Sequence, residues 1–257
     1  MNNIKKIIIV TATTANFVFS CFAGELEQKL MNAIIEKDSK TVKSLIDEND
    51  LDLNTKYNFY NKPDYKQTIL MEAVKINCIE IVGLLIDMAK QINEQNPGFL
   101  ETFLNAEDND GWTAFHYAAF LGSFKITELL IDTAKQINKQ NPKFLETFLN
   151  VKDKNGSTAL HCATIGRCIE ISKLLIEAAK QINEQNPGFL KTFLDAKDIN
   201  GTTALDLAIE QAINGERYYY HDFFKLIEKA FMSLKQVNSR FGEDDFDFGE
   251  GDCDCGD

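Results

Sequence analysis

Apolar residues recur at helical spacing along most of the chain, and the pattern as a whole repeats every 45 residues. Residues 91–105, 136–150 and 181–195 read QINEQNPGFLETFLN, QINKQNPKFLETFLN and QINEQNPGFLKTFLD, and the first matches each of the others at 13 of 15 positions. Self-similarity at a fixed period is the signature of a repeat architecture, in which each unit buries its apolar face against the next. The sequence therefore predicts a stack of similar units.

A second marker keeps the same 45-residue interval. It reads GWTAFHYAA, GSTALHCAT and GTTALDLAI, and a related segment, KQTILMEAV, lies one interval earlier; the four begin at Gly111, Gly156, Gly201 and Lys66. A turn dipeptide such as Asp110-Gly111 leads into a threonine whose hydroxyl can cap a short helix. These threonines are Thr68, Thr113, Thr158 and Thr203.

Two more helices are expected in each unit. Breaks at Asn77-Cys78, Gly122-Ser123 and Arg167-Cys168 precede a second helix whose apolar residues recur at helical spacing. Asn96-Pro97, Asn141-Pro142 and Asn186-Pro187 predict a third, short helix, with asparagine as the cap and proline at the first helical position. Its Phe and Leu side chains fall on one face, and we expect the third helices to stack into a ridge of their own.

The predicted fold class is all-α: a solenoid of stacked helix-turn-helix units with a short third helix inserted in each. It covers residues 24–240, with units that start near 26, 66, 111, 156 and 201. Ala33 to Ile46 fits a two-helix N-terminal unit, and the last unit has an insertion around 214–221 and no Asn-Pro helix. Atypical end units are expected because each must present one face to water.

The motif Gly-x-Thr-Ala-Leu/Phe-His-x-Ala, followed by Ile-x-x-Leu-Leu-Ile and Leu-Asn-x-x-Asp, resembles the ankyrin repeat. The resemblance covers roughly residues 26–238 and is most specific in the units from Gly111 and Gly156, which carry His116 and His161. The usual unit of this family has 33 residues, so about 12 residues are inserted here between the second helix and the turn. The resemblance implies a protein-interaction scaffold, in which the two histidines hold the turns by hydrogen bonds.

The N-terminal segment 1–23 has the pattern of an export signal. Lys5 and Lys6 precede sixteen residues without a charge, and Cys21-Phe22-Ala23 places small residues before a cut ahead of Gly24. An uncleaved membrane anchor, a buried amphipathic segment and a lipoprotein modified at Cys21 remain open alternatives. We expect the protein to be exported or secreted, with a membrane association only if this segment is retained or lipidated.

Charge narrows the classes of partner. The net charge is −12, but residues 243–257 hold eight acids and no base, so the remainder carries about −4. An acidic chain lacks the basic face that nucleic acids and anionic membranes attract, so no nucleic-acid partner is expected. We predict that residues 241–257 form a disordered acidic tail, because dense like charges repel. Its Cys253-x-Cys255 pair is too small a set to fill a metal site.

No arrangement of residues predicts catalysis, a cofactor or a metal. Phosphate-binding loops and zinc or nucleophile motifs are missing from the sequence, so no small-molecule substrate is expected and the protein is predicted not to be an enzyme. Asp108-Asn109-Asp110-Gly111 lacks the remaining ligands of a calcium loop and is read as a turn. Cys162 and Cys168 lie on either side of the end of one first helix, and a disulfide between them is an alternative if the chain is exported.

The resemblance implies that partners contact the residues beside each turn and at the exposed end of each first helix. Carried over position by position, this predicted partner-binding set is Tyr65, Gln67, Lys75, Asn109, Asp110, Trp112, Phe120, Lys154, Ser157, Ile165, Ile199, Thr202 and Glu210. We expect Trp112 and Phe120 to point outward as interface anchors, with packing of Trp112 on the neighbouring turn as the alternative.

Two further functions stay open: an envelope-tethered structural protein, and a targeting arm for an enzymatic or metal-binding activity.

Overall fold

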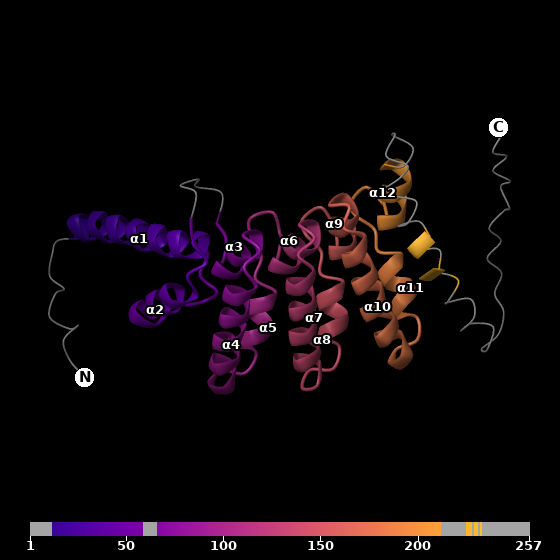
Figure 1. Ribbon diagram of the computed structural model, residues 1–257, viewed down its shortest axis with the longest axis horizontal. Helices are drawn as coiled ribbons and strands as arrows, with labels where there is room; N and C mark the ends of the chain where they lie inside the picture. Colours follow the sequence, from indigo (N-terminus) through magenta and orange to yellow (C-terminus); the bar gives the residue numbers. More distant parts are fainter. Residues whose placement is uncertain (1–11, 59–65, 212–224, 228, 231, 233–257) are drawn as a thin grey trace.

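The protein, described from a computed structural model, is a row of helical units placed side by side (Figure 1). The structure describes residues 12–58, 66–211, 225–227, 229–230 and 232, with side chains from residue 24 onward. The helices defined in these residues are α1 (Ala12–Ile35), α2 (Ser39–Asn49), α3 (Ile69–Lys75), α4 (Ile79–Gln95), α5 (Phe99–Leu104), α6 (Ala114–Phe120), α7 (Phe124–Asn138), α8 (Phe144–Leu149), α9 (Ala159–Ile165), α10 (Ile169–Gln185), α11 (Phe189–Leu194) and α12 (Ala204–Gln211). The predicted all-α class is confirmed.

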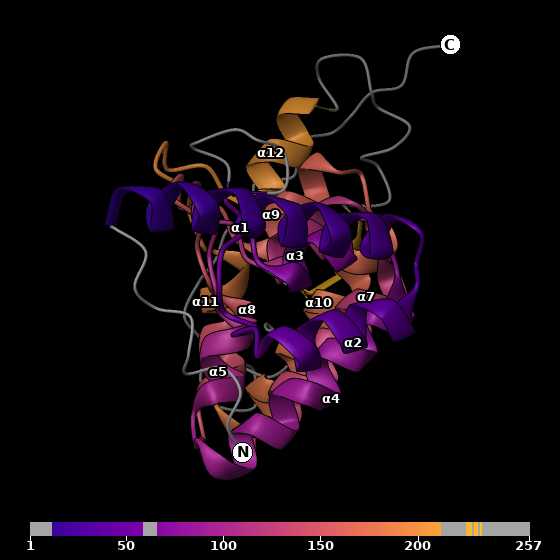
Figure 2. The same cartoon turned by 90° about the vertical axis from the view of Figure 1, so that its left-hand side faces the viewer.

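The helices form three rows along the stack. The first helices α3, α6, α9 and α12 pack on one another in sequence, and so do the second helices α4, α7 and α10. Viewed along the stack, the second helices lie on one side and the third helices α5, α8 and α11 on the other (Figure 2). This is the predicted helix, helix, short helix, turn unit, repeated at constant spacing.

Threonine caps begin the first helices, as expected. Thr68 Oγ1 accepts a hydrogen bond from the Met71 amide at 3.3 Å, and Thr113 and Thr158 each form a capping box with the histidine three residues later. In the last unit Asp206 replaces the histidine, and its carboxylate accepts from the Thr203 amide at 2.8 Å. The cap satisfies amides that the first helical turn would otherwise leave unpaired.

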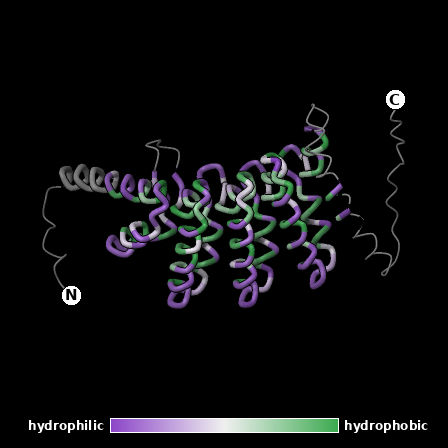
Figure 3. The backbone as a smooth tube through the Cα atoms, viewed as in Figure 1, coloured by the Kyte–Doolittle hydropathy of each residue, from purple (hydrophilic) through white to green (hydrophobic). Residues whose placement is uncertain are grey.

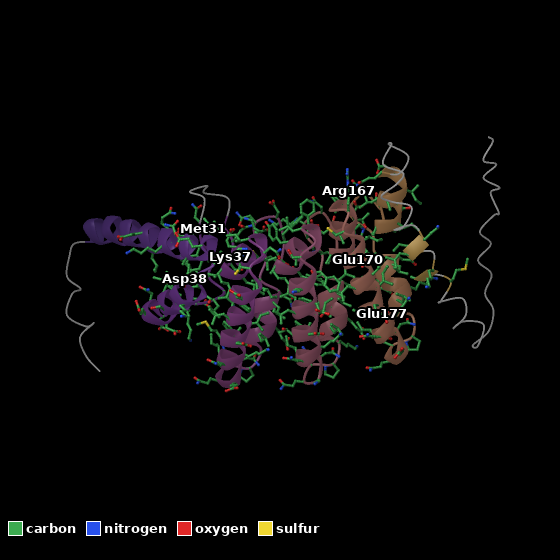
Figure 4. All side chains as sticks on the ribbon, in the orientation of Figure 1. Met31, Lys37, Asp38, Arg167, Glu170 and Glu177 are labelled. Atoms are coloured by element: carbon green, nitrogen blue, oxygen red, sulfur yellow. The ribbon has the colours of Figure 1, made fainter. Side chains whose placement is uncertain are left out.

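The expected breaks between first and second helices are confirmed, and each depends on one residue in the left-handed region. Asn77, Gly122 and Arg167 have φ values of 53°, 69° and 59°. Lys37 holds the same conformation in the first unit, where Asp38 then caps α2 by accepting from the Lys40 and Thr41 amides at 3.1 Å (Figure 4). This conformation reverses the chain in two residues, so the second helix packs back on the first.

The third helix begins later than predicted. The asparagine of Asn96-Pro97 is not its cap: α5 starts at Phe99, after Gly98 in the left-handed region at φ 92°. The cap comes from the end of the preceding helix, where Asn93 Oδ1 accepts from the Gly98 amide at 3.0 Å and the Leu100 amide at 3.1 Å. Asn138 and Asn183 do the same for α8 and α11. The proline instead lies in the tight turn between the two helices.

Each third helix packs mainly on second helices. α5 contacts α4 of its own unit and α7 of the next, and α8 likewise contacts α7 and α10. Their Phe side chains complete the core: Phe103, Phe148 and Phe193 are each about 1% exposed, and the Phe148 ring lies 4.4 Å from that of Phe115 on α6. Hydrophobic positions accordingly face inward, and hydrophilic ones gather at the loop ends of the second helices (Figure 3).

The two ends of the stack differ from the middle. Helix α1 runs without interruption through Gly24, and its buried residues among the described side chains begin at Leu30. Within the described residues, none of the helices combines the length and apolar character that a membrane span requires. The predicted acidic tail 241–257 and the insertion around 214–221 lie outside the described residues.

Candidate functional site

The turns that precede the first helices are built on one repeated aspartate. Asp108 Oδ1 accepts from the amides of Asp110 and Trp112, both at 2.9 Å, and Asp153 and Asp198 make the same pair of bonds one and two units later. Oδ1 of each carboxylate is therefore committed to main-chain donors, as the interpretation of Asp108–Gly111 as a turn expects. Among the described residues, no group of three or more His, Cys, Asp or Glu side chains is placed to hold a metal ion.

Neighbouring turn tips are joined to each other. The Lys154 amide donates to the Asp110 carbonyl at 3.0 Å, and its ammonium group donates to the Asn109 carbonyl at 2.6 Å. The Ile199 amide donates to the Asn155 carbonyl at 2.8 Å in the next pair of units. These bonds fix the tips at one spacing, so that their exposed side chains form a single continuous surface rather than separate mobile loops.

His116 and His161 connect successive units and are structural, as predicted. His116 Nδ1 accepts from the Thr113 amide at 3.2 Å, while Nε2 donates to the Ser157 carbonyl of the next unit at 3.2 Å. His161 makes the same bonds to Thr158 and to the Thr202 carbonyl. Burial outweighs the nearby acids and lowers the pKa of both rings below the usual 6.5, so both are neutral at physiological pH.

Trp112 lies against its own unit. Its ring is 4.9 Å from the ring of Tyr117 and 5.6 Å, edge to face, from that of Phe120. The indole is half-buried against the core, so it does not point freely outward. Phe120 is 36% exposed. The three rings form one aromatic patch that runs from the turn to the end of α6.

Gln67 is not at the surface, which corrects its place in the predicted partner-binding set. It is 1% exposed, and its amide donates to Tyr117 Oη and to Asp108 Oδ2 of the next unit. Lys75 donates to Gln67 Oε1 at 2.7 Å and forms an ion pair at 2.9 Å with the buried Glu72. Met71 occupies the position of the histidine in this unit and Glu72 that of Tyr117, and this polar network takes the place of the histidine bond between units.

The remaining predicted residues divide into three groups. The exposed ones are Asn109, Asp110, Phe120, Lys154, Ile165, Ile199 and Glu210; Lys75, Trp112, Ser157 and Thr202 are half-buried; Tyr65 lies outside the described residues. Phe120 and Ile165 occupy the same position on α6 and α9, and the two helices touch closely, because a Cβ on Gly166 would lie 2.0 Å from the Phe120 carbonyl oxygen. The structure thus brings Trp112, Phe120 and Ile165 onto one face.

Three further apolar residues near helix breaks are exposed and were not predicted from the sequence. Leu121 follows α6 and Phe124 begins α7, and they are 47% and 42% exposed; Ile35, at the first-unit position equivalent to Phe120, is 53% exposed. Leu121 stands where the next unit carries Gly166, and this difference was the signal available in the sequence. Leu121 and Phe124, together with Phe120 and Ile165, form an apolar band at the ends of the adjacent helices α6 and α9.

The described cysteines are all free thiols. Cys162 is buried in α9, whereas Cys168 is half-buried and its thiol donates to the Phe120 carbonyl at 3.5 Å, so the alternative of a disulfide between them is wrong. Burial raises the pKa of both thiols, of Cys162 most strongly. Neither thiol has the electropositive surroundings that activate a cysteine as a nucleophile.

Comparison with known proteins agrees with this geometry. A family model described as ankyrin repeats (3 copies) matches residues 30–141 and 139–228, which together span most of the chain. No curated protein matches the chain.

Proposed function

The chain belongs to the ankyrin repeat family, whose repeats serve as protein-interaction scaffolds, and we propose that this protein is a non-enzymatic, exported scaffold that binds a protein partner through the ends of its first helices. The observation that carries the proposal is the apolar band: Phe120, Leu121, Phe124 and Ile165 are all more than a third exposed and lie on adjacent units. Contiguous exposed apolar surface rimmed by polar residues is characteristic of protein interfaces.

The aromatic patch supplies anchors of the right kind. Trp112 is held on edge against Phe120 and next to Tyr117, whose ring lies 5.7 Å from the Lys75 ammonium. Large aromatic residues that are already immobilised lose little side-chain entropy on binding, which is why they dominate interface energies. Glu210 is exposed at the equivalent position one unit after Ile165 and gives that end of the band a negative charge, which favours one orientation of the partner.

The absence of catalysis remains part of the proposal. Both described histidines use their two ring nitrogens in bonds that cap a helix and join two units, so neither is available as an acid or base. The alternative of an enzymatic targeting arm has no residue in its favour among the described side chains.

Export is proposed from the sequence and is compatible with the packing. The buried residues of α1 begin at Leu30, so cleavage before Gly24 leaves the contact of α1 with α2 in place. Mass spectrometry of the mature N-terminus distinguishes cleavage before Gly24 from lipidation at Cys21, which is the envelope-tethered alternative, and from retention of residues 1–23. A retained, unmodified N-terminus would contradict export by this route.

Partner binding is tested by comparing variants of the band in an affinity capture. Phe120→Ser combined with Ile165→Asp should lose the captured partner at least tenfold, because the change removes apolar contact area. It should lower the melting temperature only slightly, because Ile165 is 43% exposed and Phe120, which also contacts the Trp112 ring, is 36% exposed. Glu177→Arg, on exposed α10 surface away from the band (Figure 4), is the control and should retain the partner. Equal capture by all three proteins would refute the proposed surface.

A further inference from the structure

The second helices show a periodic contact that is missing at one end of the stack. Each second helix in the middle units packs against the third helix of the preceding unit: α5 lies on α7 and α8 lies on α10. Ile137 on α7 and Ile182 on α10 occupy the same repeat position and are 7% and 8% exposed. Ile92 occupies the same position on α4 and is 36% exposed. The surface of α4 on which a preceding third helix would pack is therefore exposed to solvent.

The first unit explains why. Its second helix, α2, has 11 residues against 17 in α4, and it ends at Asp50 in the left-handed region at φ 49°. Only three residues later Leu53, which is fully buried, takes the place that Leu104 has at the end of α5. In the described part of this unit, residues 12–58, no helix corresponds to α5 or α8.

An open groove results. It has a volume of about 460 Å³ between the end of α2 and the last two turns of α4. Ile46 and Leu53 line one wall, and Met88, Ile92 and Asn96 line the other. The rim on the α2 side also carries Asp50 and the Lys43–Asp47 ion pair, so a carboxylate of the occupant would have to face the α4 side. In the later units, the equivalent space beside the second helix is filled by the third helix of the preceding unit.

The asparagine at the edge of the groove has equivalents in the later units, where each one binds a glutamate. Asn141 Nδ2 donates to both carboxylate oxygens of Glu101 on α5, at 3.0 and 3.1 Å, and Asn186 Nδ2 donates to Glu146 on α8 at 3.1 Å. In both cases the donor follows a second helix and the acceptor is the glutamate of the preceding Phe-Leu-Glu-Thr-Phe-Leu helix. Asn96 is the equivalent residue at the groove. It offers an amide donor at the place where a carboxylate would complete the pattern.

We propose that this groove binds a short amphipathic helix of another polypeptide, one that carries Phe and Leu pairs four residues apart with an acidic residue between them. Such a helix would sit on α4 as α5 sits on α7, with its apolar pairs on Ile92 and Met88 and its carboxylate on Asn96. The molecule itself shows that this chemistry fits, because two of its own six-residue helices fill the equivalent seats. The groove is separate from the apolar band, and the two proposals stand independently.

The chain supplies a matched pair of probes. A fluorescent peptide of residues 96–106, NPGFLETFLNA, carries the acidic helix, and a peptide of residues 186–196, NPGFLKTFLDA, carries lysine in place of the glutamate and aspartate in place of the last asparagine. Fluorescence anisotropy with the full chain should show saturable binding of the first peptide and several-fold weaker binding of the second. Replacing both Phe residues of the first peptide with Ser should abolish binding.

Protein variants locate the site. Ile92→Asp should weaken binding of the acidic peptide at least tenfold, and Asn96→Ala should remove most of the difference between the two peptides. Ile199→Asp, at an exposed turn tip, is the control and should bind as the wild type does. Ile92 and Asn96 are exposed enough that all variants should melt at the temperature of the wild type, which separates lost binding from lost folding.

Three results would overturn the proposal. The first is no saturable binding of the acidic peptide to the full chain. The second is equal binding by the wild type and Ile92→Asp, which would place the peptide elsewhere. The third is a dimer in analytical ultracentrifugation that Ile92→Asp dissociates, which would make a second copy of the chain the occupant.

Discussion

Acidification should destabilise this protein through its two buried histidines. His116 and His161 are at most 1% exposed, and in each ring Nδ1 accepts a main-chain hydrogen bond while Nε2 donates to the next unit. A proton added at Nδ1 would face an amide donor, and the resulting charge would be buried. The folded state therefore resists protonation, whereas the same rings in the unfolded chain accept a proton at an ordinary pKa.

The sign and size of the effect follow from this difference. Because the folded pKa is lowered, the unfolded state binds more protons below pH 6.5, so stability is complete above that value and decreases as the pH falls toward the folded pKa. Each histidine can cost up to about 1.4 kcal/mol per pH unit in this window. Between pH 7.5 and 5.5 the two together should lower the free energy of unfolding by at most about 2.7 kcal/mol.

Urea unfolding at pH 7.5, 6.5 and 5.5, followed by circular dichroism, measures this dependence. His116→Gln and His161→Gln keep an amide donor and acceptor but cannot titrate, so each should remove about half of the pH dependence even where it lowers stability at pH 7.5. Acidic groups titrate equally in all the proteins, so the difference between wild type and variant isolates the histidine. A double variant that loses as much stability as the wild type on acidification would refute the reasoning.

Further changes test the caps and the close contacts. Asn138→Ala should cost about 0.5–2 kcal/mol in urea unfolding and speed hydrogen exchange at the Leu145 amide, because it removes a cap acceptor; Asn138→Asp keeps the acceptor and should cost much less, and equal losses would exclude the capping role. Gly83→Ala should raise stability by about 0.5–1 kcal/mol, because Gly83 lies inside α4 with nothing within 4 Å of a new Cβ. Gly166→Ala should lower the melting temperature, because its Cβ would lie 2.0 Å from the Phe120 carbonyl oxygen; a melting temperature equal to that of the wild type would contradict this close approach.

The helical units were predictable because their signals are local. The spacing of apolar residues, the threonine caps and the breaks at Asn77 and Gly122 depend on residues within one turn of each other, and the structure confirms them. The start of the third helix was misplaced because its cap, Asn93, lies five residues before Gly98, in a helix that the pattern treats as a separate element. Asn96 next to Pro97 is the more obvious cap in the sequence, but both residues lie in the turn between α4 and α5.

The binding surface was less predictable, because exposure depends on neighbours that the sequence does not place. Gln67 occupies the same repeat position as Trp112, yet it is buried, because Tyr117 and Asp108 of the next unit accept its amide hydrogens. Ile92 and Ile137 are likewise equivalent in the repeat and differ only in whether a third helix precedes them.

The sequence by itself determined the repeat, its period and the residues of its core, since identical units stacked at a constant spacing bury the same positions each time. Only the tertiary structure decided which positions remain open where that regularity ends or is interrupted. There, one residue type can be either core or surface, and the difference depends on whether a neighbouring unit provides the side chains that exclude water.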